Sequence, residues 1–421
     1  MISQLFKIIW KEKKVNLWIL LELVLAFTIL WFCSDTLIFS LIKMLEPKGF
    51  NIDHTYMIDV WNEDEDADLE IFDDEEYREN AYDALWTIFE RINNHPAIEH
   101  ASLSIVASPY SGSYWGNCYF VDSIRECGQY KFVSPEFFDV FQIELLKGRT
   151  FDYDANDSES VIISAGANNL FAERNPFQID TIESAKRDVK YNVIGVANKT
   201  KRMELEEYRS VIYHCLTKEH FALSSSYYNR EFCVRVKPSA DNDFVNKFFD
   251  EMVSQLDVGP YFMASITPMS DKRKEYFEFA EYDDEFKSIF AFSAFLIVNI
   301  VLCVMGTFWL RIQSRRADIG LRMALGATKK SVQSFFILEA LLLLFLASII
   351  AFILCININE VLADVLENLG LPITGNTGFK VYITNYIVTL AVMAIIAVLS
   401  VWYPAKRASK INSVESLRIE N

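Results

Sequence analysis

Four long apolar runs constrain the architecture of this chain more than any other feature of its sequence. A helix needs about 20 mostly apolar residues to cross the hydrocarbon core of a bilayer. Four segments meet that requirement, at residues 15–39, 286–310, 334–356 and 385–403. The first run is too long for the apolar region of a signal peptide. The sequence therefore predicts a membrane protein with four transmembrane α-helices and one large domain inserted between the first two.

Basic residues beside the apolar runs predict the orientation of the chain. They cluster before the first run, between the second and third runs, and after the fourth. Lys and Arg in short flanks stay on the cytoplasmic side of a membrane. Both termini are therefore expected inside the cell and the inserted domain outside. The loop at 357–384, whose single lysine is Lys380, is expected outside as well.

The first 14 residues carry apolar side chains at helical spacing among four lysines. This pattern is typical of an amphipathic helix that lies on a membrane surface. Membrane lipid is therefore an expected partner. Nucleic acid is excluded as a partner, because the chain has a formal net charge of −17 and an acidic protein is repelled by phosphate.

Residues 40–270 are long enough to form a domain with its own core. Alternating and β-rich runs predict strands, at Tyr56–Trp61, Ser160–Ile163, Tyr191–Val196, Ser210–Tyr213 and Phe232–Val236. Apolar stripes with helical spacing predict helices from Glu75 to Ile92 and from Asp241 to Leu256. The expected fold class is α+β, in two lobes.

Two charged stretches border these elements. The acidic run Asn62–Glu76 lacks the glycine and the terminal glutamate of an EF-hand loop, so we expect a solvated loop that leads into a helix. Residues 271–285 contain no helix breaker and run directly into the second apolar run. They predict a helical stalk that joins the domain rigidly to the membrane helix, and their aromatic residues favour packing over a flexible linker.

The sequence contains no motif of a known catalytic site and no GxxxxGK[ST] loop. We therefore expect no enzymatic activity in these residues, and ATP hydrolysis in a separate subunit. No cofactor or metal is expected, because the five histidines show no ligand spacing. Four cysteines of the inserted domain are placed where disulfides are chemically permitted, and their spacing leaves the pairing open. They are Cys118, Cys127, Cys215 and Cys233.

The loop at 311–333 contains the stretch RRADIGLRMALGATKK, from Arg315 to Lys330. Asp318 is expected to cap a short helix, Gly326 to end it in the left-handed conformation, and Thr328 to cap the next helix. The short helix comprises Asp318, Ile319, Gly320, Leu321, Arg322, Met323, Ala324, Leu325 and Gly326. Its apolar residues are expected to be exposed beside Arg316 and Arg322. Docking into a groove of another protein and attachment to anionic lipid fit this pattern equally.

Glu339 lies about one turn inside the third apolar run. A carboxylate within the membrane is costly and is usually paired or functional. We expect an intramembrane ion pair between Glu339 and Arg316, with Arg311 as the alternative partner; an unpaired glutamate whose carboxylate reaches the membrane interface is the other interpretation.

The loop resembles the signature of the MacB/FtsX-like ABC transporter permeases, R-x-x-x-IG-x-R-x-A-x-GA. Tyr403–Leu417 (YPAKRASKINSVESL) is similar to the closing pattern of that family, with Ser413 in place of proline and Ser416 in place of alanine. Phe132–Phe151 and the strands after it resemble the MacB-type periplasmic core domain. The resemblance implies an FtsX-like permease domain at 300–415 and a standalone permease without a fused ATPase, while the basic residues after the fourth run predict a cytoplasmic tail at 404–421.

The resemblance also implies a mechanism and partners. Two permease subunits, identical or different, each dock on an ABC ATPase subunit through the short helix, and a periplasmic adaptor or outer-membrane component can join them. ATP-driven movement then reaches the outer domains in the inner membrane of a bacterial cell, for export or extraction of a peptide, drug or lipid-type substrate. A regulator of a cell-wall hydrolase and a membrane sensor are the alternative functions.

Overall fold

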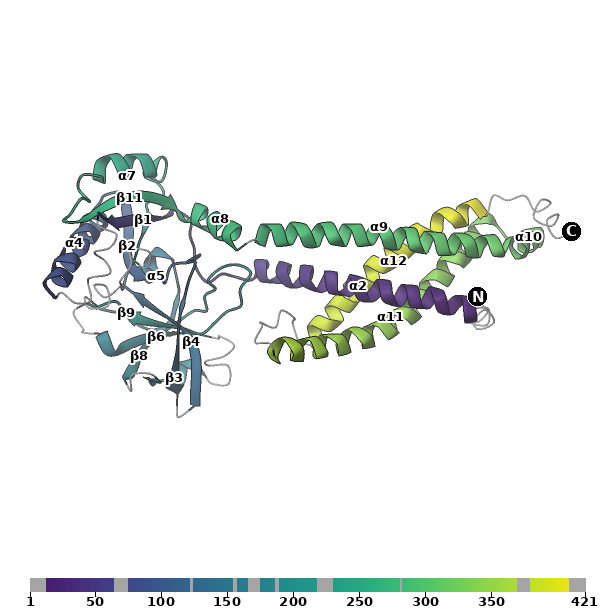
Figure 1. Cartoon of the computed structure of the whole chain (residues 1–421), viewed down its shortest axis with the longest axis horizontal. Helices are drawn as coiled ribbons and strands as arrows, with labels where there is room; N and C mark the ends of the chain where they lie inside the picture. The colour runs from purple at the N-terminus through teal and green to yellow at the C-terminus, as the bar shows by residue number, and fades with distance from the viewer. Residues whose placement is uncertain are drawn as a thin grey trace. The chain divides into compact units, whose positions relative to one another are not determined.

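The computed structural model describes residues 13–63, 75–121, 124–153, 157–165, 175–185, 189–217, 230–280, 282–368 and 379–408. The chain divides into two compact units (Figure 1), a helical unit of Met1–Ile42 with Asp283–Asn421 and an inserted domain of Lys43–Tyr282. Most of the expected surface helix at 1–14, most of the acidic run and most of the tail at 404–421 lie outside the described residues.

The helical unit contains the four helices that the apolar runs predicted. They are α2 (Lys13–Leu45), α9 (Tyr282–Ser314), α11 (Lys329–Asn368) and α12 (Phe379–Ala408). Each contains a stretch long and apolar enough to cross a membrane, with mean hydropathy between 2.2 and 2.9. Every predicted span is confirmed as a helix, and each helix extends beyond its apolar run because the flanking polar residues continue the same turns.

Small residues allow the membrane helices to pack closely. Ala347 and Ala351 of α11 and Ala397 of α12 are buried in one core with the rings of Phe27 and Trp31 of α2. Small side chains let helix backbones approach each other, and the aromatic rings fill the space that remains. The ring of Trp31 lies 5.7 Å from that of Phe352, so α2 and α11 are in direct contact in this core.

In the residues that the structure describes, the inserted domain is built around one sheet of eleven strands. The strands are β1 (Thr55–Asn62), β2 (Ile98–Ile105), β3 (Trp115–Val121), β4 (Ile124–Val133), β5 (Leu145–Gly148), β6 (Ser160–Ser164), β7 (Thr181–Ser184), β8 (Lys190–Ala197), β9 (Val211–Cys215), β10 (Arg230–Val236) and β11 (Tyr261–Pro268). The five strands that the sequence predicted correspond to β1, β6, β8, β9 and β10. The other six were not predicted from the pattern.

One part of this sheet is antiparallel and carries two helices. Its strand order is β11-β1-β10-β2, and α4 (Glu75–Asn93) and α7 (Phe244–Met252) cover it (Figure 1). Leu85 and Ile88 of α4 and Phe248 of α7 are buried against Val234 of β10. Both helices were predicted, although α7 begins at Phe244, after Asp243 in the left-handed conformation, rather than at Asp241.

The other part of the sheet closes on itself. β4, β3, β7, β8, β6 and β9 follow one another, and β9 pairs with β4 again to complete a ring of six strands. The closing pair is parallel and runs from Gln129 opposite Val211 to Val133 opposite Cys215. Tyr119, Ile163 and Ile212 belong to one core inside this part. The α+β fold class is confirmed, and the two parts of the sheet correspond to the two expected lobes.

The described part of the domain also contains a small helix and two turns of 3-10 helix. α5 (Phe137–Val140) buries three of its four side chains, which pack with Phe151 and Tyr213 in a third core. The 3-10 turns η1 (Asp157–Glu159) and η2 (Pro176–Gln178) precede β6 and β7.

The cysteines of the inserted domain differ in chemistry. Cys118 of β3 and Cys127 of β4 lie opposite each other in the ladder and form a disulfide. Cys215 and Cys233 are free thiols and are buried. Burial raises the pKa of the Cys215 thiol to about 11, so this sulfur stays protonated and unreactive at neutral pH.

The expected stalk at 271–285 is helical but interrupted. α8 (Met269–Phe279) ends at Ala280, and α9 begins at Tyr282. The helix was predicted from the absence of a breaker, and its division follows from packing instead. Met269, Tyr276 and Phe277 are buried in a core of the inserted domain, so α8 is fixed as part of that domain.

Candidate coupling helix and junction cluster

The loop between the second and third membrane helices contains the short helix that the sequence predicted. α10 spans Arg316–Ala324. Gly326 has a φ of +95°, the left-handed conformation that ends a helix at low cost only for glycine. The hydroxyl of Thr328 accepts a hydrogen bond from the Ser331 N–H at 3.2 Å, which caps α11. Both of these local predictions are confirmed.

The start of α10 differs from the prediction. Arg315 occupies the N-cap position, and Asp318 lies in the first turn without capping it. The helix begins earlier because α9 runs on to Ser314, so only Arg315 separates the two helices. The carboxylate of Asp318 still lies near the positive end of the helix dipole.

Only part of the predicted apolar face of α10 is exposed. Leu321 and Leu325 are 53% and 80% exposed, whereas Ile319 is 4% exposed and belongs to the core of the helical unit. Ile319 was expected on the surface, and that expectation is wrong. Residues two apart on a helix point in different directions, whereas residues four apart share a face. Ile319 therefore anchors α10, and Leu321 and Leu325 form its exposed apolar pair.

A basic residue lies beside this exposed pair. The guanidinium of Arg322 lies 4.3 Å from the centroid of the Phe335 ring on α11, an arrangement that favours a cation over an aromatic face. The contact ties α10 to the following helix and keeps a positive charge next to Leu321. α10 is therefore a short helix that is fixed on one side and presents two leucines on the other.

A buried charged cluster adjoins the start of α10. We call it the Glu339 cluster, and it consists of Asn16, Arg311, Arg315 and Glu339. Arg311 Nη2 lies 2.6 Å from Glu339 Oε1, and Arg315 Nη1 lies 3.1 Å from the same oxygen. Arg311 also donates to the side-chain oxygen of Asn16. The cluster thus connects α2, α9, the start of α10 and α11 through side chains that are almost entirely buried.

The expected pair between Glu339 and Arg316 is not the one that the structure shows. The partners of Glu339 are Arg311, the predicted alternative, and Arg315. Arg311 lies in the last turn of α9 and Arg315 directly after its end, whereas Arg316 is the first residue of α10. The sequence indicated the carboxylate correctly but could not show where α9 ends.

Polar side chains also connect the membrane helices elsewhere. Thr307 of α9 donates to a carboxylate oxygen of Glu22 at 2.9 Å. Asn385 of α12 donates to Asp35 of α2 at 3.0 Å. Hydrogen bonds between membrane helices satisfy groups that hydrocarbon leaves unsolvated. These pairs give Glu22 and Asp35 partners that the sequence did not predict.

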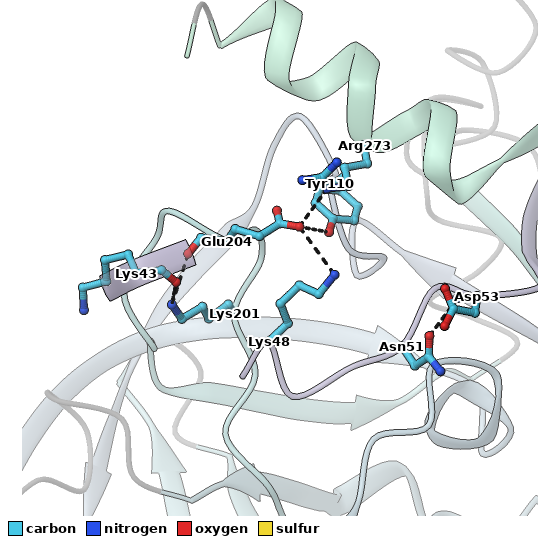
Figure 2. Close-up of polar contacts among 8 residues, drawn as sticks. All are labelled: Lys43, Lys48, Asn51, Asp53, Tyr110, Lys201, Glu204 and Arg273. Atoms are coloured by element: carbon cyan, nitrogen blue, oxygen red, sulfur yellow. Dashed lines mark hydrogen bonds and ion pairs between the residues drawn. The ribbon is translucent and has the colours of Figure 1, made fainter. Parts of the chain in front are cut away.

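A second polar site lies where the chain enters and leaves the inserted domain. We call it the junction cluster: Lys43, Lys48, Tyr110, Lys201, Glu204 and Arg273. Figure 2 shows three side chains converging on Glu204 Oε1, which accepts from Arg273 Nε at 2.8 Å, Tyr110 Oη at 2.9 Å and Lys48 Nζ at 3.4 Å. Glu204 is 6% exposed, so its carboxylate is buried, whereas Lys48 and Arg273 reach it from partly exposed positions.

Lys201 forms the other half of the junction cluster. Its ammonium donates to the backbone oxygen of Lys43 at 2.9 Å and to that of Glu204 at 3.1 Å (Figure 2). It also lies 2.7 Å from a carboxylate oxygen of Glu46. A buried ammonium needs such acceptors, because an unpaired charge inside a protein is strongly destabilising.

The cluster shifts the acidity of its members in consistent directions. Burial by itself raises the pKa of Glu204, but the hydrogen bond from Arg273 and its charge outweigh burial, so the pKa of this carboxyl is lowered. Burial and the nearby Glu204 carboxylate raise the pKa of the Tyr110 hydroxyl. Glu204 is therefore ionised at neutral pH, and Tyr110 is a hydrogen-bond donor to it.

The sequence did not predict the junction cluster. Its members come from the end of α2, the segment after β2, the segment after β8, and α8. The segment KRMELEE at 201–207 contains two basic and three acidic residues, a density of charge that normally indicates a solvated loop. No local pattern links Glu204 to Arg273, because the fold alone brings them together.

Two family models match the chain. The FtsX-like permease C-terminal model matches residues 290–413, and the MacB-like periplasmic core domain model matches residues 37–247. The first contains α10 and the Glu339 cluster except Asn16. The second contains most of the inserted domain and the junction cluster except Arg273.

Curated relatives include the macrolide export ATP-binding/permease proteins MacB of Neisseria meningitidis (serogroup B, strain ATCC BAA-335 / MC58) and Neisseria gonorrhoeae. Each is 22% identical over 300 residues, which cover 68% of this chain and 42% of the relative. The chain thus spans less than half the length of the curated relatives it matches.

Solved structures include the periplasmic region of MacB from Actinobacillus actinomycetemcomitans, at 16% identity and a TM-score of 0.34, covering 56% of this chain and 98% of that one. The extracellular domain of the noncanonic ABC-type transporter YknZ from Gram-positive bacteria matches at 14% identity and a TM-score of 0.30. It covers 50% of this chain and 100% of that one.

Four membrane-spanning helices with a β-rich domain between the first two define an ABC transporter permease of the type that carries its large domain outside the membrane. The chain belongs to the MacB/FtsX-like permease family, whose periplasmic core domain model matches half of it.

Proposed function

We propose that this chain is the permease subunit that converts ATP hydrolysis by a separate ABC ATPase subunit into movement of its inserted domain. The observation that carries this proposal is α10, anchored through Ile319 and presenting Leu321 and Leu325. A fixed helix with exposed apolar residues four apart suits docking into a groove of a partner protein. The partner we propose is the ATPase.

The Glu339 cluster supplies the route from α10 into the membrane helices. Arg315 is both the N-cap residue of α10 and a direct contact of Glu339 on α11. A force on α10 therefore acts on α9 and α11 together. A buried ion pair with short contacts resists separation, because each charge would be left unpaired in a medium of low dielectric constant.

Orientation and assembly are part of the same proposal. Lys and Arg flanks put α10 and both termini in the cytoplasm and the inserted domain on the outer side of a bacterial inner membrane. Two such chains, or this chain and a paralogue, form the permease dimer, and a periplasmic adaptor can join them. The curated relatives are named for macrolide export, and we propose export or extraction of a peptide, drug or lipid-type substrate here.

The first test is recovery of the ATPase. The tagged full-length chain is purified in a gentle detergent, and co-purifying proteins are identified by mass spectrometry. We expect an ABC ATPase subunit with the unsubstituted chain and its loss with Leu325→Asp. Because Leu325 is 80% exposed, the substitution should leave the fold intact. Recovery of no ATPase in several detergents would favour a sensor or a scaffold.

Phe279→Asp provides a matched control. Phe279 is 79% exposed on α8, so the same kind of substitution is made at an equally exposed position outside α10. We expect the ATPase to be retained in this variant. Equal loss in both variants would show a general effect of the added charge and contradict a docking role for α10.

Reporter fusions test the orientation. A reporter after Asn421 is expected to read as cytoplasmic, and one inserted in the acidic run at 62–76 as exported. The opposite readings would overturn the assignment of sides.

A further inference from the structure

The two chain connections of the inserted domain meet at one segment. The chain enters the domain at the end of α2 and leaves it through α8. Residues 199–208, which follow β8, contact both connections. This arrangement is independent of α10, because it rests on side chains of the inserted domain alone.

On the entry side, backbone groups hold the segment. Lys201 Nζ donates to the carbonyl oxygen of Lys43 at 2.9 Å. The hydroxyl of Tyr208 donates to the carbonyl oxygen of Pro47. Gly49 has a φ of +80°, and a Cβ there would lie 2.0 Å from the Lys199 carbonyl oxygen. The chain around Gly49 and the segment are therefore in close contact, with space only for glycine at position 49.

On the exit side, α8 is held through charged and aromatic groups. Arg273 donates to Glu204 at 2.8 Å, and Arg202 donates to the hydroxyl of Tyr276 at 2.9 Å. Arg273 also lies over the Phe277 ring, at 4.8 Å from its centroid. The contacts of Arg273 with Glu204 and of Tyr276 with Arg202 hold α8 to the segment at two positions, whereas the contact between Arg273 and Phe277 lies within α8.

Glu204 joins the two sides directly. One oxygen, Oε1, accepts from Lys48 on the entry side and from Arg273 on the exit side. Among the contacts of the described residues, Oε2 has no hydrogen-bond partner although it is buried. All the described hydrogen bonds of this carboxylate are therefore made by Oε1. Burying a charged carboxylate costs free energy, which these contacts must offset.

We propose that Glu204 is a positioning residue that locks the entry and exit connections of the inserted domain to each other. Through Lys48 and Arg273 the carboxylate ties the segment after α2 to α8, so that the two connections are held to each other as well as to the domain core. With the lock closed, a displacement of either connection moves the whole domain. The proposal rests on the proposed function for its role, but not for its geometry.

Glu204→Gln tests the lock with little change of shape. The amide keeps an acceptor at Oε1, and its NH₂ group replaces Oε2, which faces no donor among the described contacts. Hydrogen bonds to a charged group are roughly twice as strong as neutral ones, so the variant weakens the lock without emptying the site. The matched control is Asp271→Asn. It breaks the exposed ion pair between Asp271 and Lys274 (2.7 Å) on α8, the helix that also carries Arg273.

The measurement is the distance between spin labels in the full-length chain. Labels are attached through non-natural residues at Leu45 and Phe279, which are 75% and 79% exposed, in nanodiscs of phosphatidylethanolamine and phosphatidylglycerol. We expect a narrow distance distribution in the parent and in Asp271→Asn. In Glu204→Gln we expect a broader distribution, because the hydrogen bonds from Lys48 and Arg273 lose the charge of their acceptor and become weaker.

A second variant tests whether Glu204 acts through Arg273. Arg273→Gln should broaden the distribution as Glu204→Gln does. The double variant should broaden it no further, because both substitutions weaken the same contact, that between Glu204 and Arg273. A narrow distribution in Glu204→Gln would overturn the proposal. So would full additivity of the two single variants.

The design separates this proposal from the proposed function. The distances are measured without ATP and without an ATPase, so failure to recover the ATPase leaves the test of the lock valid. When the ATPase is recovered, Glu204→Gln should retain it, because the junction cluster belongs to the other unit of the chain. Loss of the ATPase with an unchanged distance distribution would contradict the assignment of Glu204 as the lock.

Discussion

Arg311 Nη2 lies 2.6 Å from Glu339 Oε1, and both side chains are almost fully buried. This pair cross-links α9 and α11, the two helices between which α10 is held. α10 is therefore attached to two helices that this ion pair joins, and the consequences of disrupting the pair are measurable.

Glu339→Gln should strongly destabilise the helical unit. Arg311 and Arg315 would both lose their carboxylate partner, and removing one member of a buried ion pair costs about 3 to 5 kcal/mol. Thermal unfolding in detergent measures the effect. Glu360→Gln, at an exposed position on the same helix, is the control and should unfold like the parent. Similar unfolding of both variants would contradict the assigned role of the Glu339 cluster.

Gly49 and Gly326 both have a positive φ, but substitution by alanine should lower stability by different amounts at the two positions. Gly326 and Gly49 both have positive φ, but a Cβ at Gly326 meets nothing within 4 Å, whereas at Gly49 it meets the Lys199 carbonyl oxygen at 2.0 Å. Gly326→Ala should cost about 1 kcal/mol, the conformational term alone. Gly49→Ala should cost clearly more. Comparison of the two midpoints of thermal unfolding checks the order, and a reversed order would be inconsistent with the close approach at Gly49.

The disulfide can be tested by counting the free thiols of the protein before and after reduction. Alkylation of the denatured, unreduced protein should label five cysteines, and labelling after reduction should reach seven. Cys118→Ser with Cys127→Ser should lower stability by about 2 to 3 kcal/mol, the value expected for so short a loop. Intact-mass spectrometry and thermal unfolding measure the two effects. Seven labels before reduction would show that the pair is not formed.

Lys131 should make the stability of the inserted domain depend on pH. Burial lowers its pKa from 10.5 to about 8, against the opposing charge of Glu231. Between those two values the unfolded chain holds a proton that the folded chain has lost, so stability rises with pH. Below about 8 both states are protonated, and this contribution is constant.

Lys131→Met removes that contribution. Denaturant unfolding followed from pH 7 to pH 10.5 should show a smaller rise in stability for the variant than for the parent. Other titrating groups, including tyrosines, contribute to both proteins and cancel in the difference. Parallel curves for parent and variant would contradict the lowered pKa of Lys131.

Local patterns predicted the features of this fold that depend on local chemistry. The four apolar runs gave the membrane helices, because length and hydropathy are sufficient to decide them. Gly326 and Thr328 indicated the end of α10 and the start of α11, because left-handed backbone and hydroxyl capping are properties of single residues. These predictions required no knowledge of tertiary contacts.

Tertiary packing decided the rest. Ile319 was expected on the surface and is buried, since a short apolar helix does not reveal which of its residues meets a core. The carboxylate of Glu339 selected Arg311 and Arg315 because α9 continues to Ser314, a boundary that the sequence does not mark. The contact between Glu204 and Arg273 joins residues far apart in the chain, and no periodicity could have indicated it.

The position of β1 has a consequence for how the protein is made. Its neighbours in the sheet are β10 and β11, which the ribosome synthesises much later than Thr55–Asn62. Until those strands emerge, both edges of β1 are unpaired, and unpaired edges are where strands of different molecules associate. Crowded synthesis should therefore favour aggregation of half-made chains. Slow expression at low temperature should raise the yield of folded protein.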